Sequence, residues 1–380
     1  MSHLEEWLTL YLTPGLGVAG CKNLVDWFGS PGRALKASRK ELAEVRGLRE
    51  KGLGAIGQTK TRQDAGEELR RAQQLGLNII CLDDREYPEW LHHIPNPPVI
   101  LYIKGDASAL AEPGISIVGS RAASSYGLRM AETLAGQLAG LGITVISGLA
   151  LGIDTAAHQG ALKGGGSTVA VLGCGLDLIY PPQNRALFEI IPNRGALVSE
   201  YPLGTQPDGF RFPARNRIIS GLSRGVVVVE ATLKSGSLIT AELALEQGRE
   251  VFAIPGRVDS LKSAGCHRLL QQGAKLVMSV TDILGEFVDL GSIRQAAAAP
   301  PPAPPLAELS DEERTLMAVL EIYPKHIDEI INTCLLTVDR VNELLLMLEI
   351  KGYCEVLPGQ QYQLLPISDQ KCTRVPHKGV

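Results

Sequence analysis

The sequence predicts an α/β protein: an extended, doubly wound Rossmann-like domain, with a small helical N-terminal domain and a C-terminal winged helix. Three observations lead to this prediction. Between residues 105 and 290, short Val- and Ile-rich runs alternate with helical stretches. Before residue 75 the apolar residues recur at helical spacing instead. After a Pro- and Ala-rich run at 295–307, three helical stretches precede a Pro-Gly turn. These patterns are typical of a covered parallel sheet, a helical domain and a winged helix, respectively.

The composition is that of a globular protein with two or three domains. Of the 380 residues, 45% are hydrophobic, and 37 Lys and Arg against 41 Asp and Glu give a net charge of −4. No run of about 18 apolar residues is present, and Glu5 and Glu6 stand where a signal peptide needs basic charge, so we expect a cytoplasmic protein without a membrane span. The seven cysteines, an odd number without a CxxC pair, favour free thiols over disulfides or zinc.

Residues 1–75 are predicted to form the helical domain. Its helices are expected at 4–12, 18–28, 31–37 and 40–45, separated by turns that contain Gly or Pro. In the second of these helices, Leu24, Val25 and Phe28 fall on one face. A small helical domain therefore precedes the sheet.

Residues 76–290 are predicted to form the Rossmann-like domain. Core strands are expected at 115–118, 145–146, 169–172, 196–198, 226–229 and 251–254, with edge strands at 78–81 and 99–103. The core runs are apolar on both faces, which is typical of parallel strands between two layers of helices. The order of strands and helices thus predicts a doubly wound sheet.

The remaining chain is predicted to contain a linker at 291–307, a winged helix at 308–367 and a tail at 368–380. In the winged helix we expect helices at 311–322, 327–332 and 338–350, and a hairpin around 357–360. Residues 308–367 carry eleven Asp or Glu and four Lys or Arg, a net charge of −7. Because an acidic helix fits poorly against DNA phosphates, we expect a protein-contacting or regulatory domain rather than the main DNA reader.

Small polar residues follow several of the core strands. These strand ends carry Gly119, Ser120 and Arg121; Ser147 and Gly148; Gly173, Cys174 and Gly175; and Lys234 to Ser237. Ligands of doubly wound sheets bind outside the carboxyl ends of the strands, so we expect a phosphate-bearing ligand there, although each loop alone also fits a simple tight turn.

Missing motifs narrow the choice of ligand. Neither GxxxxGK[ST] nor, after the first core strand, GxGxxG occurs, which disfavours an NTPase and an NAD enzyme. No HExxH, paired-His or Asp-rich cluster indicates a metal, and we expect no cofactor. His158 and Cys174 are interpreted as structural rather than catalytic residues.

The basic residues concentrate in one aromatic-containing segment. From Arg211 to Lys234 the chain has five basic residues against one acid, Glu230, and Phe210 and Phe212 lie at its start. Cations that track a phosphate backbone beside rings that stack on bases are typical of single-stranded nucleic acid binding. A solvated helix start with its rings in the core is the alternative.

Five ordered segments resemble the DNA-processing protein DprA (Smf) family. They are 117–121, 147–158, 173–184, 212–223, and 228–231 with 235–237, and the resemblance covers about residues 82–277. The helical start resembles the family's sterile-alpha-motif-like domain, and the acidic end resembles its winged helix. The resemblance implies a dimeric, non-enzymatic protein that binds and protects incoming single-stranded DNA during natural transformation. It also implies help in loading RecA onto strands covered by single-stranded-DNA-binding protein.

The same resemblance assigns residues to the DNA site. Gly119, Ser120 and Arg121 match the family's GSR motif, with Arg121 contacting phosphate; Phe212 matches the base-stacking aromatic; and Arg215, Asn216 and Arg217 match the stretch that shapes the pocket. Gly209 stands where some relatives have a DNA-contacting lysine. Arg211 or Lys234 would then have to supply that charge.

Two other functions remain open from the sequence. Similar sheets with a PGGxGTxxE motif cleave nucleoside monophosphates at the N-glycosidic bond, but here Leu243 falls on the motif glutamate and only Glu242 lies beside it. A transcription regulator that senses a metabolite and reads operators with its winged helix is the second alternative. The charge of −7 in residues 308–367 argues against it.

Overall fold

The computed structural model describes residues 2–287, 309–334 and 336–365, which belong to two compact units, Met1–Ala298 and Ala299–Val380. The predicted linker at 291–307 and tail at 368–380 lie outside the described residues. Within the described ranges, no helix is both long enough and apolar enough to cross a membrane.

The first unit is built around a nine-stranded sheet with the order β1-β2-β6-β5-β4-β3-β7-β8-β9. The strands are β1 (Asn78–Cys81), β2 (Ile100–Gly105), β3 (Gly114–Val118), β4 (Thr144–Ser147), β5 (Thr168–Leu172), β6 (Gly195–Ser199), β7 (Gly225–Val228), β8 (Glu250–Ala253) and β9 (Lys275–Leu276). Pairing is parallel from β6 through β9 and antiparallel at β1-β2 and β2-β6. The predicted doubly wound domain is confirmed, and so is the edge position of β1. The prediction of an edge strand at 99–103 is wrong, because β2 pairs with both β1 and β6. The short β9 was not predicted.

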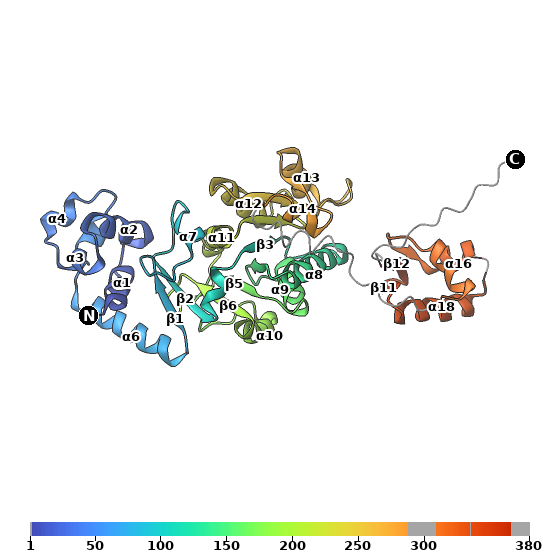
Figure 1. The fold of residues 1–380 in the computed structure, drawn as a ribbon, viewed down its shortest axis with the longest axis horizontal. Helices are drawn as coiled ribbons and strands as arrows, with labels where there is room; N and C mark the ends of the chain where they lie inside the picture. The colour runs from blue at the N-terminus through green and yellow to red at the C-terminus, as the bar shows by residue number, and fades with distance from the viewer. Residues whose placement is uncertain (1, 288–308, 335, 366–380) are drawn as a thin grey trace. The chain divides into compact units, whose positions relative to one another are not determined.

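Helices cover both faces of this sheet (Figure 1). The helices of this part are α7 (Glu89–His92), α8 (Ser125–Gly140), α9 (Ile153–Lys163), α10 (Arg185–Ile190), α11 (Arg211–Leu222), α12 (Gly236–Glu246), α13 (Ala264–Gln271) and α14 (Val280–Leu284). Ile115 and Ile117 of β3 pack with α8 and α9, whereas Val118 belongs to the cluster that contains α11 and α12. Successive strand residues point to opposite faces, so an unbroken apolar strand serves both layers.

The N-terminal helices belong to the same unit and pack beside β1 and β2 at one edge of the sheet. They are α1 (His3–Tyr11), α2 (Gly17–Phe28), α3 (Pro31–Lys36), α4 (Arg39–Glu44), α5 (Glu50–Leu53) and α6 (Thr59–Gln74). The Tyr11 hydroxyl donates to the main-chain oxygen of Glu200, and a Glu68 carboxylate oxygen accepts the Leu203 N–H at 2.7 Å. The predicted helices are present, but α5 and α6 were not predicted.

The second unit is a winged helix, as predicted. Its elements are α16 (Asp311–Val319), β10 (Lys325–His326), α17 (Ile327–Cys334), α18 (Val338–Ile350), β11 (Cys354–Leu357) and β12 (Gln361–Leu364), with the strand order β10-β12-β11. In α18, Leu344, Leu345 and Leu348 are buried, whereas Leu346 is 56% exposed. Arg340, the one arginine of α18, pairs with Glu312 and Glu343. The helix therefore offers little positive charge to a nucleic acid.

Candidate nucleic-acid interface

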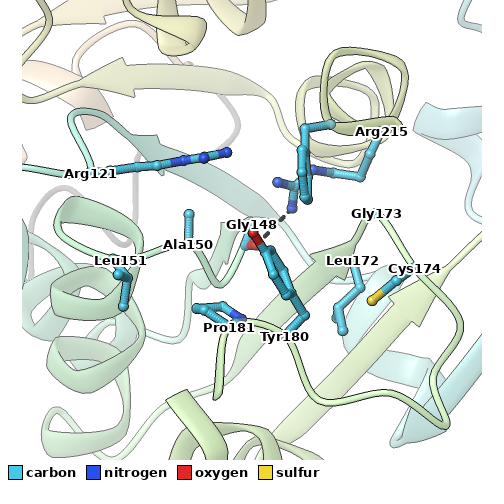
Figure 2. A pocket seen from close by; sticks show the side chains of 11 residues that line it. Arg121, Gly148, Ala150, Leu151, Leu172, Gly173, Cys174, Tyr180, Pro181 and Arg215 are labelled. Atoms are coloured by element: carbon cyan, nitrogen blue, oxygen red, sulfur yellow. Dashed lines mark hydrogen bonds between the residues drawn. The ribbon is translucent and has the colours of Figure 1, made fainter. Parts of the chain in front are cut away.

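A cavity opens at the carboxyl ends of β3, β4 and β5, against the start of α11 (Figure 2). Its walls combine the β3 loop (Arg121), the β4–α9 loop (Gly148, Ala150), the β5 end (Gly173, Cys174), the segment after it (Tyr180) and α11 (Phe212, Arg215). Neighbouring parallel strands end at the same edge of a sheet, which brings these distant segments together. The fourth predicted strand end, at Lys234, does not line this cavity.

Arg121, Phe212 and Tyr180 form one layered group at the cavity. The exposed Arg121 guanidinium lies over the Phe212 ring, with Cζ 5.3 Å from the ring centroid. The Tyr180 ring stacks on Phe212 with centroids 5.7 Å apart and an interplanar angle of 23°. Figure 2 shows Arg121 and Tyr180 extending into the cavity from separate loops. A cation beside aromatic faces suits a phosphate with its attached base.

Arg215 supports this cavity from within the protein. The residue is 4% exposed, and its Nη1 donates to the main-chain oxygens of Gly148, at 2.8 Å, and Val171. Burial lowers its pKa from 12.5 to about 10, so the guanidinium stays charged at neutral pH. A Cβ added at Gly148 would lie 2.3 Å from Nη1, so only glycine leaves room for this contact. Arg215 thus joins the ends of β4 and β5.

The other predicted strand-end residues are mainly held by the protein itself. Ser147 is buried, and its hydroxyl donates to the Ile117 oxygen at 2.7 Å. Ser120 accepts the Ala122 N–H at 3.2 Å with its own hydroxyl. A Cβ on Gly119 would lie 2.6 Å from the Ile153 side chain, so close packing against α9 explains this glycine. Among these residues, Arg121 is the one that lines the cavity with a charged side chain.

The structure separates Asn216 and Arg217 from the cavity, although both follow Phe212 closely in sequence. Neither residue lines it. The Arg217 guanidinium forms a bidentate pair with the Glu200 carboxylate, at 2.9 and 2.6 Å, and is largely buried there. Successive helix residues point in different directions, so the basic run on α11 is divided between the cavity and the side facing β6.

Arg211 and Lys234 also lie outside the cavity lining. The Arg211 guanidinium lies over the rings of Tyr201, at 5.2 Å, and Phe210, at 4.9 Å, and its Nε is 3.2 Å from Asp208. Lys234 is exposed in the β7–α12 loop, and Gly209 is exposed just before α11. Neither candidate for the charge of the missing lysine therefore lines the cavity.

Sequence reasoning did not select Tyr180 as a site residue. Its segment, Leu176 to Asn184, follows β5 and returns to the cavity, where the buried Asn184 amide donates to the Leu149 oxygen at 2.9 Å. The adjacent prolines, Pro181 and Pro182, signal a turn but not its direction. Stacking against a ring 32 positions later cannot be read from either segment alone.

His158 is a fully buried residue of α9 and does not line the cavity. Its Nδ1 lies 2.8 Å from the Thr168 hydroxyl, and burial, followed by the charge of Arg215, lowers its pKa from 6.5 to about 3. The pKa of Cys174 is raised to about 11 by burial, which keeps this thiol protonated at neutral pH. Both residues are thus better suited to packing than to acid–base or nucleophilic chemistry.

The lowered pKa of His158 predicts a loss of stability in acid. The folded protein keeps the imidazole neutral, while the unfolded chain binds a proton near pH 6.5, so this contribution is complete above pH 6.5 and is lost as the pH falls toward 3. At pH 5 we expect a cost of about 2 kcal/mol from this residue. Urea denaturation at pH 7.5 and pH 5 should show a smaller pH effect for His158→Gln than for the wild type; equal effects would contradict the assignment.

Comparisons with known proteins point to one family. A model described as DNA recombination-mediator protein A matches residues 78–288, and one described as the DprA winged helix domain matches 300–360. The chain is 36% identical to Protein Smf of Synechocystis sp., over 96% of this chain and 100% of that protein. It is 46% identical to DNA processing protein DprA of Streptococcus pneumoniae, over 65% of this chain and 86% of the relative.

Solved structures agree with these sequence matches. The X-ray structure of DprA from Streptococcus pneumoniae superposes with a TM-score of 0.67 at 39% identity, covering 76% of this chain and 98% of the other. DNA processing protein A from Helicobacter pylori, whose structure is described as giving insight into its unique single-stranded DNA binding mode, matches with a TM-score of 0.51 at 32% identity. That match covers 56% of this chain and 96% of the other.

Proposed function

Because the chain belongs to the DNA recombination-mediator protein A family, we propose that it is a single-stranded-DNA-binding recombination mediator that uses the cavity beside Arg121. One observation carries this proposal: the exposed Arg121 guanidinium lies 5.3 Å from the Phe212 ring centroid at the carboxyl ends of the parallel strands. A phosphate can pair with the guanidinium while its base stacks on the aromatic group.

In this proposal the cavity residues have different tasks. Arg121 pairs with phosphate, Phe212 and Tyr180 provide flat apolar faces for a base, and Arg215 keeps the cavity wall in place without contacting phosphate. Gly148 belongs to that wall, where its main-chain oxygen accepts the Arg215 hydrogen bond. Arg211 and Lys234, which do not line the cavity, would contact the strand outside it.

The proposed cellular role follows from the family. The protein would act in the cytoplasm as a homodimer without a catalytic step, protecting incoming single-stranded DNA during natural transformation. It would help load RecA where single-stranded-DNA-binding protein covers the strand. The acidic winged helix would contact proteins, consistent with the pairing of Arg340 to two glutamates.

The alternative functions are less well supported by the structure. Glu242, on which N-glycosidic cleavage would depend, is exposed on α12 and does not line the cavity. A regulator that reads operators would need cations on the third helix of its winged helix, and the one arginine of α18 is paired with glutamates. Release of ribose 5-phosphate from a nucleoside monophosphate would favour the enzyme.

Fluorescence anisotropy tests the proposal directly. A labelled single-stranded oligonucleotide and its duplex are titrated with the full-length protein across a salt series. We expect the single strand to bind more tightly than the duplex. Its affinity should fall as the salt concentration rises, because binding releases counterions from the phosphates. Duplex preference, or no binding of the single strand, would contradict the proposed function.

Replacing Phe212 by Ala is expected to weaken single-strand binding about tenfold, because base–aromatic stacking contributes roughly 1–3 kcal/mol per base. The dependence of affinity on salt should stay unchanged, since stacking releases no counterions. Trp27→Ala is a matched control, because Trp27 is an aromatic residue of α2 that is 58% exposed and lies outside the cavity lining. Equal losses in the two variants would argue against a stacking site at Phe212.

A further inference from the structure

We infer that Glu230 is a positioning residue for single-stranded DNA binding: it holds the loop between β3 and α8 in the shape that places Arg121 over Phe212. This inference rests on the proposed function. It adds a buried acidic residue to a site otherwise described by its basic and aromatic residues. Glu230 follows β7, is 3% exposed and does not line the cavity. It therefore acts through the neighbouring loop and not by contacting DNA.

Glu230 binds this loop on both sides of Arg121. Before Arg121, the Ser120 N–H donates to the main-chain oxygen of Glu230 at 2.8 Å. After it, the Ser124 N–H donates to Glu230 Oε2 at 2.8 Å, and the Ser124 hydroxyl donates to Oε1. One residue thus fixes both ends of a five-residue segment that has Arg121 near its start.

Close packing leaves this arrangement little freedom. A Cβ added at Gly127, in the first turn of α8, would lie 2.6 Å from the Glu230 carboxylate carbon. On the opposite side, a Cβ at Gly152 would lie 2.3 Å from the Ser120 oxygen and 2.7 Å from the Arg121 oxygen. The main chain at Arg121 is therefore held between Glu230 and the β4–α9 loop.

The contact between Glu230 and Ser124 is stronger with a carboxylate than with a neutral amide. Ser124 caps the N-terminus of α8 and presents two donors to Glu230, its N–H and its hydroxyl. A carboxylate offers an acceptor to each, and the positive end of the helix dipole favours its negative charge. A Gln side chain would accept the Ser124 N–H with its oxygen and donate its NH₂ group to the Ser124 hydroxyl, so both hydrogen bonds would become neutral ones and the charge beside the helix N-terminus would be lost. Glu230→Gln thus disturbs the loop with almost no change in side-chain volume.

The test is a double-mutant cycle on single-strand affinity, measured by anisotropy with the full-length protein. Glu230→Gln is expected to weaken binding about fivefold to tenfold, the size of the difference between a charge-assisted hydrogen bond and a neutral one. If Glu230 acts through Arg121, adding Glu230→Gln to Arg121→Ala should change affinity by less than about twofold, because the group being positioned is already absent. A merely structural role would not produce this coupling.

Glu68→Gln provides a matched control. Glu68 is a buried carboxylate that accepts a main-chain N–H from Leu203, away from the Arg121 loop. We expect Glu68→Gln to bind single strands like the wild type, whatever it costs in thermal stability. Ser124→Ala is a second variant, which removes one donor to Glu230 and should show the same coupling to Arg121 with a smaller effect.

The outcomes separate this inference from the proposed function. If Arg121→Ala binds single strands as well as the wild type does, the proposed site is wrong. If Arg121→Ala weakens binding while Glu230→Gln and Ser124→Ala do not, or while their effects multiply with that of Arg121→Ala, the positioning role of Glu230 is wrong and the site stands.

Discussion

Arg121→Ala is expected to weaken single-strand binding by about 2–3 kcal/mol, or about 30- to 150-fold, because charge-assisted hydrogen bonds of a guanidinium to phosphate contribute on this scale. The side chain is exposed and lines the cavity over Phe212, so its loss removes the cation nearest the proposed stacking face. No other variant of a cavity residue should reduce affinity more while leaving the fold intact.

The salt dependence identifies the contact as one to phosphate. Losing one phosphate contact on a single strand should lower the slope of log affinity against log salt by about 0.7. Arg121→Lys should keep this slope but bind more weakly than the wild type, since an ammonium cannot pair bidentately. Arg62→Ala, an exposed change on α6, serves as the control. An equal loss in Arg62→Ala would indicate diffuse charge attraction in place of a local site.

The fold could be predicted to the extent that burial leaves a pattern in the sequence. Strands such as β5 (Thr168–Leu172) are buried throughout and therefore apolar throughout, which indicates a parallel sheet. Helix α6 (Thr59–Gln74) was missed because it is mostly polar: it buries Ala65 and Ala72 but also Glu68, and charged residues interrupt its apolar face. Helix propensity without a clear apolar face is a weak signal.

The site could be predicted in part. The strand-end position of Arg121 and the aromatic start of the basic run predicted that Arg121 and Phe212 face one crevice, and the structure brings them together. The sequence could not predict the different roles of Arg215 and Arg217, because the pattern of a basic segment does not show which of its arginines are buried. Burial of Arg215 against main-chain oxygens, and the pairing of Arg217 with Glu200, depend on partners distant in the chain.

We therefore expect Arg215→Ala to lower the stability of the fold directly and to weaken DNA binding only as a consequence. The variant would leave the Gly148 and Val171 oxygens without their guanidinium donor and create a cavity between the ends of β4 and β5. We expect the free energy of unfolding to fall by about 3–5 kcal/mol, because the buried Asp154 carboxylate, which interacts electrostatically with Arg215, would also lose its counter-charge.

Urea denaturation of the full-length protein measures this effect, with Arg62→Ala as a surface control expected to change stability by less than about 0.5 kcal/mol. Single-strand binding should then be measured at a temperature where Arg215→Ala is still folded. If Arg215 mainly contacts DNA, the variant will lose affinity with unchanged unfolding free energy. If Arg215 instead joins the ends of β4 and β5, the free energy of unfolding will be lower. Single-strand affinity will then fall only because the cavity wall at Gly148 is distorted.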